Sequence, residues 1–164
     1  MANAIYPAAK DSFLKGEIDL IDDTIKIALV DTGTYTYNAA HDFYNDLSGV
    51  IGTPVALGSK TVSSGVFDAA DATFTTPSSG TSVEALVIYK DTGNTATSNL
   101  IAYIDTGTGL PFTTNGADVD IVFDSGSNKI FALWESLRKY LRQKVEYLRN
   151  MLQVLRVHQL ENVR

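Results

Sequence analysis

The sequence contains no cysteine among its 164 residues, which excludes disulfide bonds and zinc sites with cysteine ligands. Histidine is nearly absent as well: His41 and His158 lie far apart, and neither has a second histidine at helical ligand spacing. No apolar run approaches the roughly 20 residues of a membrane-spanning helix, and the N-terminus lacks the pattern of a signal peptide. We therefore expect a soluble protein that is not secreted by an N-terminal signal.

Arginine is missing from residues 1–133, which hold six lysines and sixteen acidic residues, a formal charge of −10. Residues 134–164 hold seven basic residues, five of them arginine, and three acidic ones, a formal charge of +4. The single tryptophan, Trp134, opens this second segment. The change in composition predicts two parts, a domain at 1–133 and an appended segment at 134–164. The acidic charge of the first part argues against nucleic acid as a partner of the whole chain.

Three apolar runs, at residues 24–33, 82–93 and 99–107, each end in the triplet Asp-Thr-Gly. The Asp side chain can accept a hydrogen bond from the backbone two residues on, and Gly can adopt the positive φ of a reversal, so each run predicts a strand that ends in a turn. The first run is apolar on both faces, which predicts a central strand. The second and third flank a polar loop and predict an antiparallel hairpin.

A short helix is predicted over residues 5–18, because Pro7 suits a first turn and Gly16 suits a helix end. Its inward face is predicted to hold Phe13, Leu14 and Ile18. A second short helical turn is predicted at residues 39–47.

Further short strands are predicted, and Gly and Ser punctuate several of them; they lie at residues 53–57, 60–67, 72–75, 118–124 and 129–133. In residues 118–124, Val119, Ile121 and Phe123 alternate with acidic residues, which predicts one buried and one solvated face. About eight short strands with brief helices indicate an all-β fold, an antiparallel β-sandwich or open barrel with a short N-terminal helix.

From residue 134 the apolar period changes to about 3.5, and no Pro or Gly interrupts the chain. This pattern predicts one long C-terminal α-helix at 134–164, amphipathic and similar to a coiled-coil strand. Since a lone helix of this kind is marginal in water, we expect it to self-associate or bind a partner helix. Binding of its basic side to nucleic acid or a membrane surface is an alternative. The predicted association face consists of Leu137, Leu141, Val145, Leu148, Met151, Leu152 and Leu155.

The Asp-Thr-Gly triplets also suggest an enzymatic alternative. Aspartic proteases place their catalytic carboxylates in such triplets, where two facing copies share a proton. Asp31 and Asp105 would form the pair. We favour the turn interpretation, because the chain holds three copies and a protease needs two, and we expect no enzymatic activity.

Metal and cofactor sites find little support in the sequence. We expect His41 to be a surface or cap residue. Asp118, Asp120 and Asp124 lack the glycine and terminal glutamate of an EF-hand loop and are better explained as the outward face of a strand, with a weak calcium site as the alternative. We expect no cofactor.

Several blocks that occur in order in residues 1–133 resemble a family of short structural proteins of tailed bacteriophages. The blocks are the opening MANAIY, then DTIKIALVDTGTYT, SGVFDAADATFT, SVEALVIYKDTG, LIAYIDTGTGLP and NGADVDIVFDSGSNKIFAL. The resemblance implies a virion component, an all-β module that decorates the capsid or forms part of the tail. It carries over no catalytic residue.

Further expectations follow from this resemblance. It implies a homo-oligomer that contacts other virion proteins, in a particle assembled in the cytoplasm of the bacterial host. Residues 134–164 depart from the family pattern, so we interpret them as an unrelated segment fused to a phage-type carrier domain. A natural variant with an extra assembly helix is the alternative.

Overall fold

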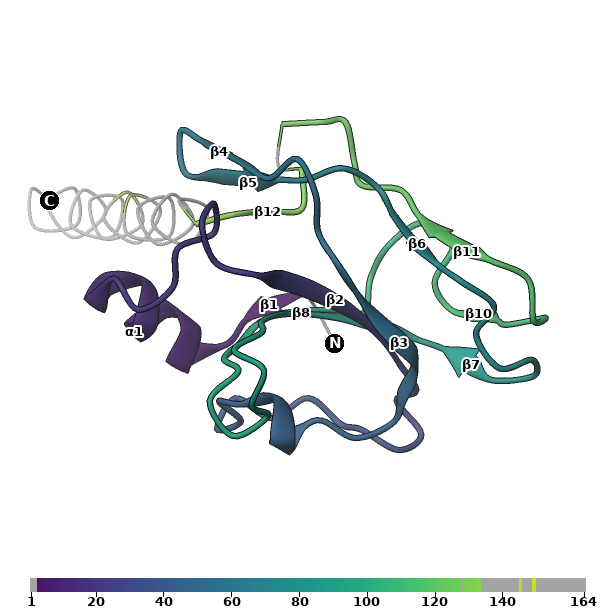
Figure 1. Ribbon diagram of the computed structural model, residues 1–164. Coiled ribbons are helices and arrows are strands. Elements are labelled where there is room, and N and C mark those ends of the chain that lie inside the picture. The colour runs from purple at the N-terminus through teal and green to yellow at the C-terminus, as the bar shows by residue number, and fades with distance from the viewer. Residues whose placement is uncertain (1–2, 128, 134–144, 146–148, 150–164) are drawn as a thin grey trace, which may run out of the picture.

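The computed structural model describes residues 3–127 and 129–133, together with Val145 and Arg149. Its centre is a five-stranded antiparallel sheet (Figure 1). Across this sheet the strands are, in order, β1 (Ala4–Ile5), β9 (Leu100–Ile104), β8 (Ala85–Lys90), β2 (Ile25–Val30) and β3 (Val50–Ala56).

Strand β2 is central, as predicted. It pairs antiparallel with β8 on one side and β3 on the other, and five of its six residues are buried. The side chains of a strand alternate between its two faces, so this burial means that both faces of the sheet are covered here. Lys26 is the partly exposed member, and its Nζ lies 2.6 Å from Oδ2 of Asp91.

The predicted hairpin of β8 and β9 is confirmed, with Val87 opposite Tyr103 in the ladder. Because β8 is antiparallel to both of its neighbours, β2 and β9 run in the same direction on either side of it. The carboxyl ends of β2 and β9 therefore lie at the same end of the strands, and the carboxyl end of β8 lies at the opposite end.

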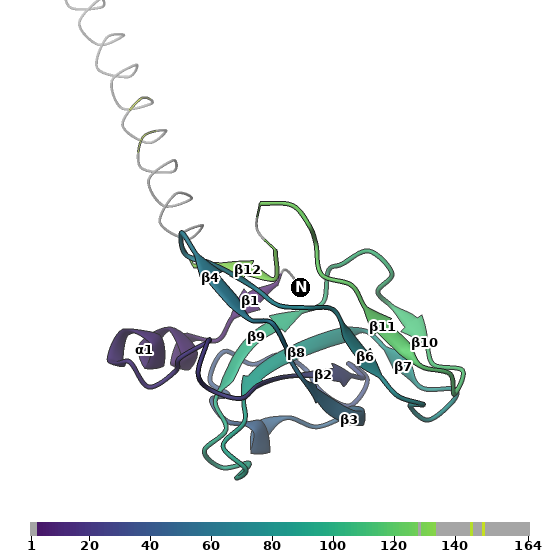
Figure 2. The ribbon, with the colours of Figure 1, turned by 45° about the horizontal axis from the view of Figure 1, so that its top comes forward.

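Three small antiparallel sheets accompany the large one. They are β4 (Thr61–Ser63) with β5 (Val66–Asp68) and β12 (Phe131–Ala132), β6 (Ala72–Phe74) with β11 (Val119–Ile121), and β7 (Ser82–Val83) with β10 (Phe112–Thr113). The first two lie above the large sheet in Figure 1, and Figure 2 shows β6 and β11 at the far end of the molecule from the N-terminal helix. Phe67 of β5 and Phe74 of β6 are each 1% exposed and join the core.

The N-terminal helix α1 (Pro7–Lys15) ends at Gly16, whose φ of 71° closes the helix in the left-handed conformation, as predicted. Within the helix, Ala9 and Ser12 are buried. The predicted inward face is right for Ile18, which is 6% exposed, and for Phe13, which packs against the core, but it is wrong for Leu14, which is 88% exposed. The reason is the preceding strand β1, which the sequence did not predict. Pairing of β1 with β9 fixes the entry of the chain into the helix and thereby the side that faces the sheet.

The second helical turn, predicted at residues 39–47, is present only as the three-residue 3₁₀ turn η1 (Tyr44–Asp46). Asp46 Oδ2 accepts hydrogen bonds from the backbone N–H groups of Asp42 and Phe43, and Phe43 and Leu47 are both extended. The carboxylate thus closes a single turn, and the chain leaves the helical conformation on both sides of it.

The predicted fold class is wrong as stated. Within the described residues, α1 is the single helix of seven or more residues, and the long C-terminal α-helix is not shown because nearly all of residues 134–164 fall outside the described part. The second layer is also not a complete sheet, as a sandwich or barrel requires. It consists of strands of two or three residues, and positive φ angles occur between strands at Ser59, Ser64 and Thr76. The described part is a β-rich domain built on one open sheet.

Candidate functional site

The predicted association face at 134–164 lies outside the described residues except for Val145, whose side chain is 54% exposed. The face stays a prediction. The other predicted site residues are described, and each can be placed on the sheet.

The first two Asp-Thr-Gly triplets form the predicted side-chain turns. Asp31 Oδ1 accepts a hydrogen bond from Gly33 N–H at 2.7 Å, and Asp91 Oδ1 accepts one from Gly93 N–H at 3.0 Å. The prediction of positive φ holds for Gly93, at 79°, but not for Gly33 or Gly107. At Gly33 the side-chain turn is close instead: a Cβ there would lie 2.9 Å from Asp31 Oδ1, so the Asp31 carboxylate would have to shift.

Replacing Asp91 by asparagine is expected to lower the free energy of unfolding by roughly 0.5–1.5 kcal/mol at pH 7, since it removes the ion pair with Lys26. The hydrogen bond from Lys26, followed by that from Gly93 N–H, holds the pKa of the Asp91 carboxyl below its ordinary value. A depressed carboxyl pKa adds stability above the unfolded-state pKa, and this stability is lost as the pH falls through the folded-state pKa.

The difference between wild type and Asp91→Asn should therefore begin to shrink near about pH 4, the ordinary pKa of Asp, and should disappear only below the lower pKa of the folded state. Urea denaturation from pH 7 to acid pH measures it. A difference that persists unchanged in acid would contradict the assignment.

Asp31 and Asp105 are the predicted catalytic pair. They follow strands β2 and β9, which run in the same direction, so both residues lie at the same end of the sheet's strands. Each carboxylate is used locally. Asp31 Oδ2 accepts a hydrogen bond from Thr34 Oγ1 at 3.1 Å, and Asp105 Oδ1 accepts one from Thr106 Oγ1 at 3.1 Å. These contacts are those of turns, and the protease dyad stays a prediction.

His41 is part of a chain of aromatic side chains rather than a cap. Its Nδ1 lies 3.0 Å from the Tyr35 hydroxyl, which in turn lies 2.9 Å from the Tyr6 hydroxyl. Burial raises the pKa values of both tyrosines, so both hydroxyls remain protonated at neutral pH. The chain joins the loop that carries His41 to the start of α1.

The outward acidic residues of residues 118–124 brace the β6–β11 pair. Thr76 N–H donates to Asp118 Oδ1 at 2.9 Å, and Thr73 Oγ1 donates to Asp120 Oδ1 at 2.6 Å. Among the described residues, no group of three or more His, Cys, Asp or Glu side chains could hold a metal ion. The calcium alternative thus gains no support from this part of the chain.

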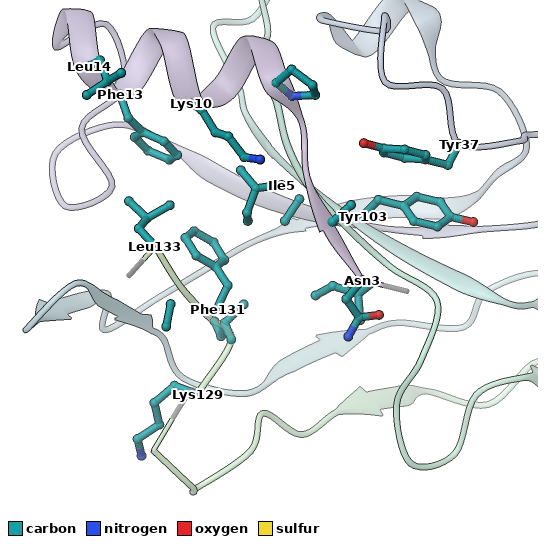
Figure 3. Close-up of a pocket in the computed structure, with 16 residues that line it drawn as sticks. Asn3, Ile5, Lys10, Phe13, Leu14, Tyr37, Tyr103, Lys129, Phe131 and Leu133 are labelled. Atoms are coloured by element: carbon teal, nitrogen blue, oxygen red, sulfur yellow. The ribbon is translucent and has the colours of Figure 1, made fainter. Parts of the chain in front are cut away.

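An open, mainly apolar groove of about 810 Å³ lies beside α1 (Figure 3). We call it the α1 groove. Phe13 and Leu14 of the helix line one side, Ile5 lines the floor, and Phe131 and Leu133 line the other side. Leu133 is 39% exposed, so the groove presents apolar surface to solvent from both walls. Lys10 and Lys129 also line it.

The α1 groove lies between two sheet edges. Strand β1 is the outermost strand of the five-stranded sheet, and β12 is the outermost strand of the three-stranded sheet. Both contribute residues to the lining. An outermost strand has one row of backbone N–H and C=O groups without a ladder partner, so the groove combines apolar side chains with backbone groups that can accept a further strand.

Comparisons with known proteins leave the family open: no family model matches the chain, and no curated protein is similar to it. A search for membrane-spanning segments among the described residues finds no helix of sufficient length and apolarity.

Proposed function

We propose that the chain is a non-enzymatic structural protein of a tailed-bacteriophage particle, and that it acts by assembling with copies of itself and with other virion proteins. The observation that carries the proposal is the α1 groove, where exposed apolar side chains lie between the open edges β1 and β12. A surface that combines exposed apolar side chains with open strand edges is suited to binding another polypeptide chain. The proposed location is the virion, assembled in the cytoplasm of the bacterial host.

The resemblance to phage structural proteins supports the proposal because of where its blocks fall. They supply β2, β8 and β9, which are the three inner strands of the large sheet, and also β11. The resemblance therefore concerns the segments that build the fold rather than one surface loop.

Charge supports a second copy as the occupant of the α1 groove. Two of the six lysines in residues 1–133 line it, although this part of the chain has a formal charge of −10. Lys10 is exposed and forms no ion pair among the described residues, and Lys129 lies 3.4 Å from Asp68. The net acidic charge of a second copy is complementary to these two lysines.

The variant Leu14→Glu is expected to weaken self-association at least about tenfold, because it places a carboxylate in an apolar contact. Leu14 is 88% exposed, so the fold of the single chain should tolerate the change. The matched control is Val122→Glu, which alters an apolar side chain that is 73% exposed and lies outside the groove. Light scattering over a range of concentrations measures the mass of all three full-length proteins.

A wild-type protein that remains monomeric at every concentration, or equal weakening by both variants, would remove the support for assembly through the α1 groove. The virion assignment has its own test. Mass spectrometry of purified phage particles that encode the chain should find it in many copies per particle, and its absence from them would overturn the assignment.

A further inference from the structure

Tyr6, Tyr35 and His41 form a chain of side-chain hydrogen bonds that reaches from the core to a partly buried ring. Tyr6 is 0% exposed, so water does not reach its hydroxyl group, and the described partner of this group is the Tyr35 hydroxyl at 2.9 Å. Tyr35 is 2% exposed, and its hydroxyl also lies 3.0 Å from His41 Nδ1. His41 is only partly buried, so solvent protons reach the outer end of the chain.

The count of donors determines the direction of both hydrogen bonds. A neutral imidazole has one nitrogen that accepts, and each tyrosine hydroxyl has one proton to donate. Both hydroxyl protons find an acceptor when Tyr6 O–H donates to Tyr35 Oη and Tyr35 O–H donates to His41 Nδ1. The reverse direction would leave the Tyr6 proton buried without an acceptor, which costs free energy. The satisfied chain therefore has no proton on Nδ1.

Protonation of His41 is incompatible with this arrangement. Both nitrogens of a cationic imidazole are donors, so the two hydroxyl groups and Nδ1 then supply three donors for two bonds. Whichever way the bonds reorient, one donor is left without an acceptor in the chain, unless the ring leaves Tyr35. In both cases the chain loses a hydrogen bond.

The titratable groups around the chain leave His41 as the one whose charge changes near neutral pH. The rings of Tyr37 and Tyr103 lie beside the chain, and burial raises the pKa of both, so they stay neutral. Asp46 is within electrostatic range of His41 and Tyr35, and hydrogen bonds from backbone N–H groups lower the pKa of its carboxyl. Asp46 is therefore charged throughout the range in which histidine titrates. Its charge favours a cationic ring and offsets part of the cost of opening the chain.

We propose that the chain is a pH-sensitive latch on the N-terminal segment. With His41 neutral, both bonds form and tie Tyr6, at the start of α1, to the loop that carries His41. With His41 protonated, one bond is lost and the hold on Tyr6 weakens. A histidine side chain ordinarily takes up its proton as the pH falls below about 6.5.

Titration of the two histidine rings by nuclear magnetic resonance tests the latch in the full-length protein. In Tyr35→Phe the neutral ring loses its donor, so the midpoint of the His41 titration should rise by about one pH unit, a tenfold change in proton affinity. His158, whose signals are identified with His158→Asn, is the control in the same sample, and its midpoint should not move. Equal His41 midpoints in wild type and Tyr35→Phe would overturn the proposal.

Hydrogen exchange of the Tyr6 backbone N–H, which donates to Ile101 O at 3.0 Å, measures the hold on the segment. The matched variant is His41→Asn, whose side-chain oxygen can accept in place of Nδ1 and does not titrate. Between about pH 8 and about pH 5.5, protection should fall at least about threefold more in wild type than in His41→Asn. An equal fall would show that His41 does not control the segment. Melting temperatures confirm that each variant is folded.

The latch adjoins the α1 groove, because Tyr6 connects β1 to α1 and both elements line the groove. Regulation of self-association by the latch rests on the proposed function. Light scattering should then show weaker association at about pH 5.5 than at about pH 8 in wild type but not in His41→Asn. Equal association of wild type at both values would overturn this regulation. A chain that stays monomeric would contradict the proposed function alone, since titration and exchange judge the latch within one chain.

Discussion

The variant Leu29→Ala is expected to lose about 2–5 kcal/mol of unfolding free energy, the range for truncating a buried leucine. Leu29 lies in β2, is 0% exposed, and faces Leu86 and Ile51 on the two neighbouring strands. Because both faces of the sheet are covered at this point, the neighbours cannot close the space without moving a strand. A loss of this size is a large fraction of the 5–15 kcal/mol that stabilises a typical domain.

Leu14→Ala is the matched control, since it removes the same atoms from a side chain that is 88% exposed. Its effect should stay within about 0.5 kcal/mol. Both variants are measured by urea denaturation at low protein concentration, so that association does not contribute. If the two leucines cost the same, β2 would not be the centre of the core.

Gly49→Ala is the second substitution with a large expected effect, a loss of more than about 2 kcal/mol. Gly49 has a φ of 64°, and its carbonyl accepts a hydrogen bond from Asp31 N–H at 2.9 Å. A Cβ at this position would lie 2.8 Å from the backbone oxygen of Asp31 and 3.0 Å from Thr34 Cβ. The methyl group must therefore displace the turn that follows β2, in addition to straining its own backbone.

Gly80→Ala separates these two causes. Gly80 also has a positive φ, at 80°, but a Cβ there would meet nothing within 4 Å. Its cost should be that of the backbone conformation alone, about 1–2 kcal/mol. Thermal unfolding of both variants gives the comparison, and equal losses would show that the approach to Asp31 is unimportant.

The inner strands were predictable because the local signals agree with one another. In β2, apolar residues on both faces stand directly before Asp31 and its turn, and both features point to a buried strand that stops there. The hairpin of β8 and β9 was predictable for the same reason. Burial and turn chemistry are encoded within a few neighbouring residues, so a short window of sequence is sufficient.

The edge of the fold was not predictable in this way. Residues 4–5 form a strand only because β9 offers an open side, and residues near 66–68 pair with 131–132 across more than sixty positions. No short window contains such a partner. The prediction for Leu14 failed with it, since Leu14 looks like a core residue until β1 determines which side of the helix faces the sheet.

Both hollows were missed for a related reason. The walls of the α1 groove come from residues near 5, 13 and 131, and those of a second hollow, of about 440 Å³, come from residues near 37, 84 and 105. Assembling either one requires the strand order.

The two edge strands of the five-stranded sheet, β1 and β3, differ in how readily they can pair with a further strand. On β3, Pro54 has no backbone N–H to offer, and β6 packs against that strand, whereas β1 borders the open α1 groove. If copies join through the sheet, they can do so on one side only. A single free edge strand pairs with the same edge strand of a second copy about a two-fold axis, which limits the assembly to two subunits. A sheet with two free edge strands would instead permit open-ended addition of further copies.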